Sequence, residues 1–479
     1  MAEDHGSRRP SSDAPSSSRR RWWRRLSLVG AVMLALVYVA GITQLGEVEA
    51  EVAREVPRID GDVRDEFADL LRALPPGGGP DDVLESIASE PERASELASA
   101  TPDPRAGELS AGLAALAADA GEFDPVDVGG FFSELDEQLG PDSASWLGLR
   151  YPSVIGALPG APFEARVVAN RVSLTAAAYD TARIDSPERP WNTDVERPPR
   201  EEVAALVGSD RQFVYFDPYN NAGDGSWIEI VGDLGSAETV TVLVPGGSAV
   251  LTSENFDVYY QRARSFVDAA DGKLAVVVWA GASWPSGWVE ESWASWAAVA
   301  AESLAAFTFD LRAQIGSDVP VTLAGHSYGG AVIGLSETHD LAADRILHIA
   351  SAGMGNDVYE PEDLNQPCRP RYSITAPGDP ISYIQGMPYV PLLGHGADPD
   401  DFPGVRNLYA GHLPDAPDAV DDTGVSLEAQ GLSGKAVEGI HSHSEIFYPE
   451  SDAWNNILAV MLGDEPEEAA DQPGPIEGC

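Results

Sequence analysis

The sequence predicts an α/β fold: a mostly parallel sheet with helices on both faces, preceded by a transmembrane helix and an acidic helical region. Three observations lead to this prediction. From residue 212 onward, apolar runs of strand length alternate with stretches of helical period. Residues 26–46 carry no charge and are long enough to cross a bilayer. Residues 47–145 are rich in acidic residues and Ala, with apolar residues three or four positions apart.

The charge balance excludes nucleic acid as a partner. The 479 residues include 77 Asp and Glu against 30 Lys and Arg, a formal net charge of −47. Such a surface repels a phosphate backbone. The 43% of hydrophobic residues is enough for a large buried core. Cys368 and Cys479 are too few for a disulfide scaffold or a Cys-rich metal site, although the two could pair with each other outside the cell.

The N-terminal part predicts a single-pass signal anchor. Residues 1–25 form a basic tail, the uncharged stretch runs from Leu26 to Gly46, and acidic residues follow it. This asymmetry keeps the N-terminus in the cytoplasm and places the main body of the chain outside. A cleaved signal peptide is the alternative, and it would give a secreted protein. We favour the uncleaved anchor, because the apolar run is longer than the apolar core of a signal peptide and no Ala-x-Ala cleavage site follows it.

The acidic residues 47–145 predict short amphipathic helices, for example at 65–74 and 81–88, with acidic residues in the first turn. A solvated acidic stalk and a packed helical subdomain both fit this composition. The segment 463–479 is acidic and contains Pro, so we expect a disordered tail.

The segment 146–462 predicts the main domain. Two of its strands, 239–245 and 274–280, are nearly continuous apolar runs, which indicates burial on both faces of the sheet. The expected helices are 253–271, 293–315 and 451–462. The expected strands are 212–216, 226–231, 239–245, 274–280, 320–327, 345–351, 371–377 and 405–411.

A Gly-x-Ser-x-Gly motif centred on Ser327 is the strongest chemical signal. A strand run ends at the motif, and a helix rich in small residues follows it. A strand-to-helix turn that is this tight strains the backbone at the serine and exposes its hydroxyl. Ser327 is therefore the candidate nucleophile.

A serine nucleophile needs a base and an orienting acid later in the chain. Asp379 is the candidate acid, because it directly follows a predicted strand, with Asp357 or Glu360 as substitutes. His443, just before the last helix, is the preferred base. The alternatives for the base are His441, His412 and His395. A metal pair formed by His441 and His443 lacks a carboxylate at ligand spacing, so we expect no metal.

An acyl-transfer site also needs N–H donors for the oxyanion. Tyr328, the residue after the nucleophile, is the first candidate. Gly247, in the Pro-Gly-Gly turn after the third strand, is the second, with Gly246 as its alternative. Five Trp residues follow the fourth strand, and Trp284 and Trp288 are candidates for the substrate pocket; a structural aromatic cluster is the other interpretation.

The segment from Trp146 to Leu462, about two thirds of the chain, resembles the α/β-hydrolase superfamily and, more closely, an actinobacterial family of α/β hydrolases. The resemblance implies Ser327 as nucleophile, Asp379 as acid and His443 as base. The acidic region before Trp146 and a long loop from Asp415 to Gly439 depart from the pattern and affect cap shape and specificity. The matching segments are Tyr151-Pro-Ser-Val-Ile-Gly-Ala-Leu-Pro-Gly-Ala-Pro, Ala169-Asn170-Arg171, Leu243-Val-Pro-Gly-Gly, Gly-His-Ser327-Tyr-Gly-Gly, Ala-Pro-Gly-Asp379-Pro-Ile and His443-Ser-Glu.

These features predict a membrane-anchored, extracytoplasmic serine hydrolase without a cofactor. It would cleave an ester-type bond, or a thioester or amide, in a small-molecule or lipid-like acyl substrate. The sequence does not indicate an oligomeric state. A catalytically inactive surface or scaffold protein on the same fold is the alternative, and a carrier of apolar molecules is a third interpretation.

Overall fold

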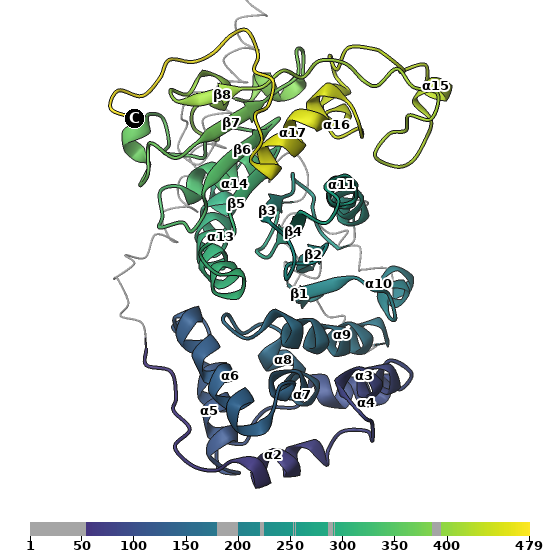
Figure 1. Cartoon of the computed structure of the whole chain (residues 1–479), viewed down its shortest axis with the longest axis vertical. Coiled ribbons are helices and arrows are strands. Elements are labelled where there is room, and N and C mark those ends of the chain that lie inside the picture. The colour runs from purple at the N-terminus through teal and green to yellow at the C-terminus, as the bar shows by residue number, and fades with distance from the viewer. Residues whose placement is uncertain are drawn as a thin grey trace, which may run out of the picture. The chain divides into compact units, whose positions relative to one another are not determined.

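A computed structural model describes residues 54–179, 200–220, 225–251, 253, 255–285, 291, 293–385 and 394–479. The residues from Glu51 to Cys479 form one compact unit (Figure 1). The predicted basic tail and the anchor from Leu26 to Gly46 lie outside the described residues. In the ranges that are described, no helix combines the length and the apolar character that a bilayer span requires.

An eight-stranded, mostly parallel sheet confirms the predicted α/β fold, and each of the eight predicted strands is present. The strand order is β1-β2-β4-β3-β5-β6-β7-β8. Strand β2 runs antiparallel to both of its neighbours, and all other neighbouring pairs are parallel. The strands are β1 (Gln212–Asp217), β2 (Ser226–Val231), β3 (Thr239–Val244), β4 (Leu274–Ala280), β5 (Val321–His326), β6 (Arg345–Ile349), β7 (Arg371–Ile374) and β8 (Val405–Asn407).

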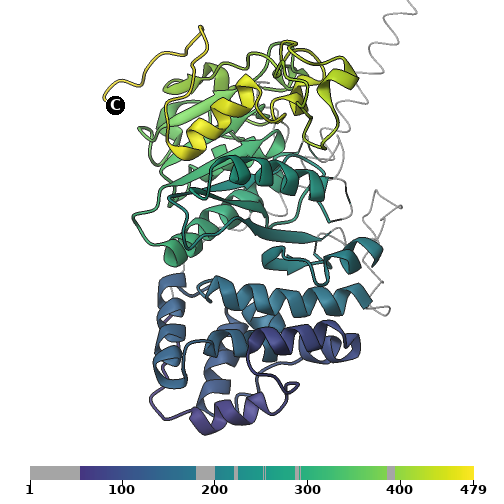
Figure 2. The same ribbon diagram turned by 45° about the vertical axis from the view of Figure 1, so that its right-hand side comes forward.

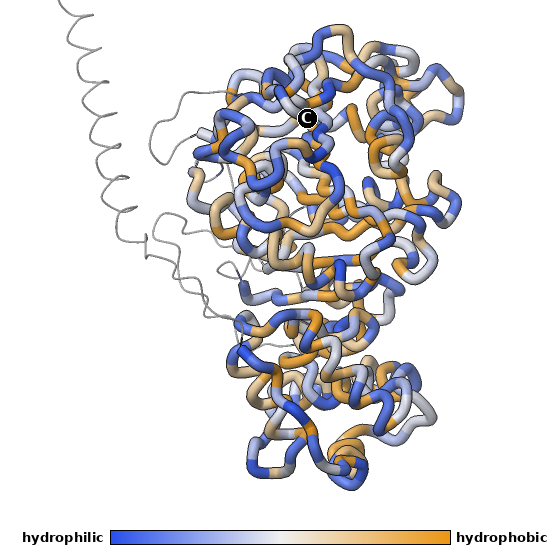
Figure 3. Tube along the Cα trace, turned by 60° about the vertical axis from the view of Figure 1, so that its left-hand side comes forward, coloured by the Kyte–Doolittle hydropathy of each residue, from blue (hydrophilic) through white to orange (hydrophobic). Residues whose placement is uncertain are grey.

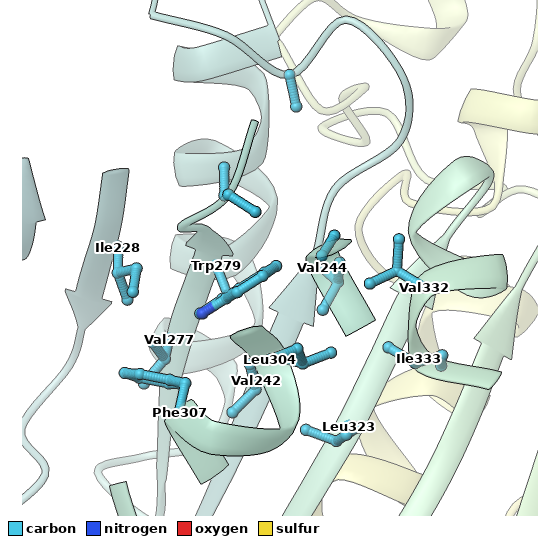
Figure 4. Packing of buried hydrophobic residues seen from close by; sticks show 14 of the residues in the cluster. Ile228, Val242, Val244, Val277, Trp279, Leu304, Phe307, Leu323, Val332 and Ile333 are labelled. Carbon is cyan, nitrogen blue, oxygen red and sulfur yellow. The ribbon is translucent and has the colours of Figure 1, made fainter. Parts of the chain in front are cut away.

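Helices cover both faces of the sheet, because alternate residues of the central strands point to opposite sides. On one face, Trp279 of β4 packs with Leu304 and Phe307 of α13 (Figure 4). On the other face, Val278 of the same strand joins the apolar cluster of α11 and α17. The three predicted helices are confirmed as α11 (Asn255–Ala269), α13 (Ala294–Ile315) and α17 (Asp452–Leu462).

Residues 54–179 form packed helices rather than a solvated stalk (Figure 2). Two apolar clusters hold these helices together. Hydrophilic and hydrophobic residues are interspersed along the chain (Figure 3). The predicted boundary between residues 145 and 146 falls inside α7. The helices are α2 (Arg64–Leu71), α3 (Pro80–Ala88), α4 (Pro91–Ala98), α5 (Glu108–Ala118), α6 (Pro125–Leu139), α7 (Ser143–Arg150), α8 (Pro152–Ile155) and α9 (Phe163–Tyr179), followed by α10 (Arg200–Leu206).

Helix α9 joins these helices to the sheet through buried polar groups. The Asn170 side-chain amide donates to the carbonyl oxygens of Gly156 and Phe213, both at 3.1 Å. Arg166 pairs with Asp310 of α13 at 2.5 Å, and both side chains are buried. Because unpaired buried polar groups are costly, these contacts fix the helices against β1 and α13.

The sequence predicts a disordered C-terminal tail. In the structure, this tail instead follows the outer edge of the sheet. Strand β8 is an edge strand of the described sheet, and the tail supplies hydrogen-bond partners for its polar groups. Asn407 N–H donates to the Gln472 side chain at 2.9 Å, and Ala469 N–H donates to Asn407 O at 2.8 Å. A disulfide joins Cys368 to Cys479 and fixes the end of the tail. Acidic composition alone did not reveal these contacts.

The described residues contain six further helical segments in the second half of the chain. They are α14 (Tyr328–Ser336), η2 (Pro361–Asp363), η3 (Pro380–Tyr383), η4 (Pro399–Asp401), α15 (Leu427–Gln430) and α16 (Ser442–Glu445).

Candidate active site

Ser327 occupies a strained turn between β5 and α14. Its φ is 54° and its ψ is −121°, a left-handed conformation that costs energy for any residue except glycine. Ser327 N–H donates to Ile349 O at 3.0 Å, while its carbonyl accepts from Gly330 and Ala352 N–H groups. These hydrogen bonds from β6 and α14 hold the strained conformation in place.

The glycines of the motif are required by close packing. A Cβ on Gly329 would overlap the carbonyl oxygens of Val244 and Pro245, and one on Gly330 would overlap the Ser351 side chain. The helix can therefore start directly against the end of β3 and the residues after β6 only because Gly329 and Gly330 lack side chains.

The predicted acid and base form a pair. His443 Nδ1 lies 3.0 and 3.1 Å from the two carboxylate oxygens of Asp379. The Asp379 side chain is fully buried, whereas that of His443 is 29% exposed. Asp379 Oδ1 also accepts from Ile381 N–H at 2.9 Å, so it caps η3. With its Nδ1–H directed at Asp379, the imidazole keeps the Nε2 lone pair as a proton acceptor.

His326 brings this pair next to Ser327. Its Nε2 lies 3.0 Å from the backbone carbonyl oxygen of His443, and the two imidazole ring centroids are 4.7 Å apart. In the described part of the chain, Ser327 Oγ makes no hydrogen bond to His443. Such bonds are often long before a substrate binds. The sequence-predicted triad residues are thus neighbours in space, although they lie on three separate segments.

The structure distinguishes between the two glycines of the candidate oxyanion loop. Gly246 lies beside Ser327, since a Cβ on Gly246 would come within 3.1 Å of Ser327 Cβ. Gly246 N–H already donates to the Tyr259 hydroxyl at 2.6 Å. Among the described residues, no hydrogen bond uses Gly247 N–H. Tyr328 is the first residue of α14, where the N–H has no partner within the helix.

Trp284 supports the oxyanion loop. Its indole N–H donates to Gly246 O at 2.6 Å, and its side chain is buried against the rings of Trp279 and Tyr328. These contacts match the structural aromatic cluster more closely than an open pocket wall. Trp288, the other predicted pocket residue, lies outside the described residues.

The alternative histidines have other neighbours. His395 is buried against the Tyr328 ring, and its Nε2 lies 2.9 Å from Glu291 O. His412 is exposed, with Asp452 Oδ2 at 3.7 Å from its Nδ1. His441 precedes α16, and no hydrogen bond of the described residues joins its side chain to Asp379.

The alternative acids are likewise engaged elsewhere. Asp357 accepts from the Asn356 side-chain amide at 3.2 Å, and Glu360 caps η2. Over the described ranges, no cluster of three or more His, Cys, Asp or Glu side chains is arranged to hold a metal ion.

Three residues near the site escaped the sequence analysis: Tyr259, Arg262 and Glu291. The carboxylate of Glu291 lies against Gly247 and accepts from the Ser248 hydroxyl at 3.1 Å. Tyr259 and Arg262 reach the site from α11, whose helical period gave no sign of a polar contact. His326 stood in the motif itself, and its position before the nucleophile was the available signal.

Comparisons with known proteins support an α/β-hydrolase fold. Residues 220–389 match the sequence model of a family described as alpha/beta hydrolase, which supports a hydrolase. None of the curated proteins compared with the chain matches it. The family match ends before His443, so the assignment of a role to His443 rests on its contact with Asp379 and not on the match.

Several solved structures are similar to parts of the chain. An esterase domain from Rhodothermus marinus is 15% identical, with 36% of this chain and 79% of that chain covered and a TM-score of 0.24. A poly(3-hydroxybutyrate) depolymerase from Bordetella parapertussis is 15% identical, with 56% and 95% covered and a TM-score of 0.30. A serine hydrolase without a lid from Xanthomonas campestris is 14% identical, with 38% and 78% covered and a TM-score of 0.23.

Proposed function

We propose that this chain is a membrane-anchored, extracytoplasmic serine hydrolase that cleaves an ester-type bond. The proposed roles are nucleophile for Ser327, general base for His443 and orienting acid for Asp379. One observation carries the proposal: the residue before a strained serine at the end of a buried strand contacts the backbone of a histidine that is paired with a fully buried aspartate. The match of residues 220–389 to an alpha/beta hydrolase family supports the same chemistry.

The mechanism follows from the hydrogen-bond directions. Asp379 accepts the Nδ1–H of His443, so Nε2 can take the proton of Ser327 as its Oγ attacks the substrate carbonyl. The N–H groups of Tyr328 and Gly247 would stabilise the resulting oxyanion. His443 then returns the proton to the leaving alcohol, which leaves Ser327 acylated. Water, activated in the same way, releases the acid and restores Ser327.

Exposed apolar side chains near the site favour an apolar acyl substrate. Tyr383, four positions after Asp379, is 83% exposed, and Ile440, three positions before His443, is 72% exposed. Ligand pockets are lined mostly by apolar and aromatic side chains. A small-molecule or lipid-like ester is the first choice, and thioesters and amides use the same catalytic groups.

The proposed location rests on two features. The basic residues 1–25 followed by the uncharged segment from Leu26 to Gly46 favour an anchor with the catalytic domain outside. The disulfide between Cys368 and Cys479 favours an oxidising compartment, as found outside the cytoplasm. If the segment is cleaved, the protein is secreted.

A fluorophosphonate probe tests the proposal, because it reacts with serines that a neighbouring base has activated. The full chain, purified in detergent, is treated as wild type, as Ser327→Ala and as Ser303→Ala. Ser303 is an exposed serine of α13 and serves as the matched control. We expect an adduct on Ser327 by mass spectrometry in the wild type and in the Ser303 variant, and none in Ser327→Ala. A folded wild-type protein that does not label would favour the inactive surface or scaffold protein.

A further inference from the structure

Two buried side chains form a short hydrogen bond behind the candidate nucleophile. Tyr259 of α11 is 2% exposed, and His326, the last residue of β5, is 4% exposed. The Tyr259 hydroxyl lies 2.6 Å from His326 Nδ1. Neither residue takes part in the proposed proton transfers, yet both are adjacent to groups that do.

Tyr259 contacts the oxyanion loop, and His326 contacts the backbone of His443. The Tyr259 hydroxyl accepts from Gly246 N–H at 2.6 Å, which fixes the loop that carries Gly247. His326 Nε2 lies 3.0 Å from the carbonyl oxygen of His443. A continuous set of hydrogen bonds therefore joins the oxyanion loop, the residue before Ser327 and the backbone of the base.

Only one neutral tautomer of His326 satisfies all of these contacts. Gly246 N–H can only donate, so the Tyr259 hydroxyl accepts from it and uses its own hydrogen for His326 Nδ1. His326 then carries its proton on Nε2, which donates to the His443 carbonyl. The neutral Nε2–H tautomer is thus built into the arrangement, and a second proton on Nδ1 would break the bond from Tyr259.

The surroundings favour this neutral state. Burial is the main cause that lowers the pKa of His326 well below its usual value, and the nearby His443 and Arg262 lower it further. Arg262 lies 5.1 Å from the Tyr259 ring centroid and 4.2 Å from that of Phe447, and Asp422 neutralises it at 2.9 Å. Burial also raises the pKa of Tyr259, so its hydroxyl keeps the hydrogen that it donates.

We infer that Tyr259 and His326 are positioning residues that hold the oxyanion loop, Ser327 and His443 in register with one another. This inference rests on the proposed hydrolase function. Such a role differs from simple core packing, because it depends on one hydroxyl and one tautomer rather than on side-chain volume. It also explains why Gly247, and not Gly246, remains the donor for the oxyanion.

Kinetics of the full chain on a short-chain 4-nitrophenyl ester test the role. Tyr259→Phe keeps the ring and removes the hydroxyl, and Tyr260→Phe, the next residue on α11, is the matched control. We expect kcat to fall about 100-fold in Tyr259→Phe, as when reacting groups shift by about 1 Å, with little change in KM. The control should keep the wild-type kcat. A Tyr259→Phe variant with wild-type kcat would overturn the inference.

Conservative rescue separates positioning from packing at His326. Glutamine offers a carbonyl acceptor and an N–H donor, as the neutral imidazole does, whereas leucine offers neither. We expect His326→Gln to retain clearly more activity than His326→Leu at equal folded content, judged by circular dichroism. Equal losses in the two variants would indicate that only the imidazole volume matters and would contradict the inference.

A measurement without turnover keeps the inference separate from the proposed function. With histidine labelled by ¹⁵N in the full chain, the His326 signal is identified by its absence in His326→Gln. We expect the neutral Nε2–H tautomer to persist at acidic pH in the wild type, and a mixture of tautomers or charging in Tyr259→Phe. An Nδ1–H tautomer in the wild type would refute the arrangement. A wild type with the expected signal but no fluorophosphonate adduct would refute the hydrolase and leave the arrangement standing.

Discussion

At the scale of single residues, the Asp379 carboxylate decides which nitrogen of His443 carries a proton. Its two oxygens lie 3.0 and 3.1 Å from Nδ1 and are shielded from water, so the Nδ1–H tautomer is strongly favoured. The same carboxylate accepts from Ile381 N–H and is thereby fixed in direction. The orientation of the base therefore depends on charge and geometry together.

Replacement of Asp379 by Asn separates these two effects. Asparagine can still accept from Ile381 N–H, but its amide N–H₂ would favour the other His443 tautomer. We expect kcat for ester hydrolysis to fall about 10⁴-fold with the fold retained. Steady-state kinetics and circular dichroism check this, with Asp401→Asn as the control, since Asp401 is an exposed aspartate of η4. An Asp379→Asn variant within about tenfold of wild type would assign the acid to another residue.

The residues that the sequence could and could not predict differ in how local their signals are. Ser327 stands in a strand-turn-helix motif, and Asp379 follows a strand, so local patterns predicted both. His443 had to be chosen among four histidines, and the contact with Asp379 is what distinguishes it. Tyr259 lies 67 positions from His326, and no local pattern connects residues that far apart. Only the packing of α11 against the sheet brings them together.

At the scale of elements, the segment before β7 is fixed by a buried ionic cluster next to the disulfide. Glu337 accepts from Arg369 at 3.0 Å and from Arg371 at 2.6 Å, and all three side chains are buried. Cys368, which precedes this cluster, holds Cys479 at the end of the tail. The ionic cluster orients the segment, and the disulfide attaches the tail to it.

Removal of the disulfide should destabilise the fold. The disulfide closes a loop between residues 111 positions apart, so its loss raises the entropy of the unfolded chain. We expect Cys479→Ser to lower the free energy of unfolding by about 2–4 kcal/mol in denaturant titrations. Cys368→Ser and the double variant should lose the same amount, because each removes one shared bond. Additive losses would show that the sulfur atoms contribute separately.

Segment η4 carries a carboxyl group that destabilises the folded state near neutral pH. Burial raises the pKa of Asp398 from its ordinary 3.8 to about 6. The folded state thus holds this proton more tightly than the unfolded state does. The contribution of Asp398 to stability is present below the unfolded pKa and is lost as the pH rises through about 6.

Asp398→Asn should remove this penalty while the amide oxygen still accepts from Asp400 N–H, which lies 2.9 Å from the native carboxylate. We expect a higher Tm than wild type at about pH 8 and no gain at about pH 4, measured by thermal unfolding. Asp418→Asn, which changes an exposed carboxylate elsewhere in the domain, is the control. The same gain at both pH values would contradict the titration argument.

The elements themselves were largely predictable from the sequence. The eight strands and the helices α11, α13 and α17 follow from apolar periodicity, a local property. The composition of residues 47–145 left a stalk and a packed subdomain equally open, because their packing depends on contacts distant in sequence, such as Val63 N–H with the Gln138 side chain. The course of the tail along β8 was missed for the same reason: its partners are distant in sequence.

At the scale of the whole molecule, the excess of acidic residues acts on stability through self-repulsion. The chain has a formal net charge of −47. Because the N-terminal 25 residues are basic, the excess negative charge lies mainly in the compact unit from Glu51 to Cys479. Repulsion among like charges favours the expanded chain, and dissolved ions screen it over about 10 Å at 0.1 M salt.

Thermal stability should therefore rise with salt. We expect the Tm of the full chain in detergent to increase between about 0.05 and about 1 M NaCl at neutral pH, as screening lowers the repulsion. The increase should shrink near pH 4, where about half of the ordinary carboxyl groups are protonated. Differential scanning fluorimetry at both pH values checks this. A Tm independent of salt at neutral pH would rule out self-repulsion as a significant term.

The disulfide closes a covalent ring that contains two of the three proposed catalytic residues. Asp379 and His443 both lie between Cys368 and Cys479, whereas Ser327 lies before this closed ring. A protease that cuts one peptide bond inside the ring leaves both new ends attached to the rest of the chain. The proposed acid and base therefore stay tethered to the proposed nucleophile after a single nick.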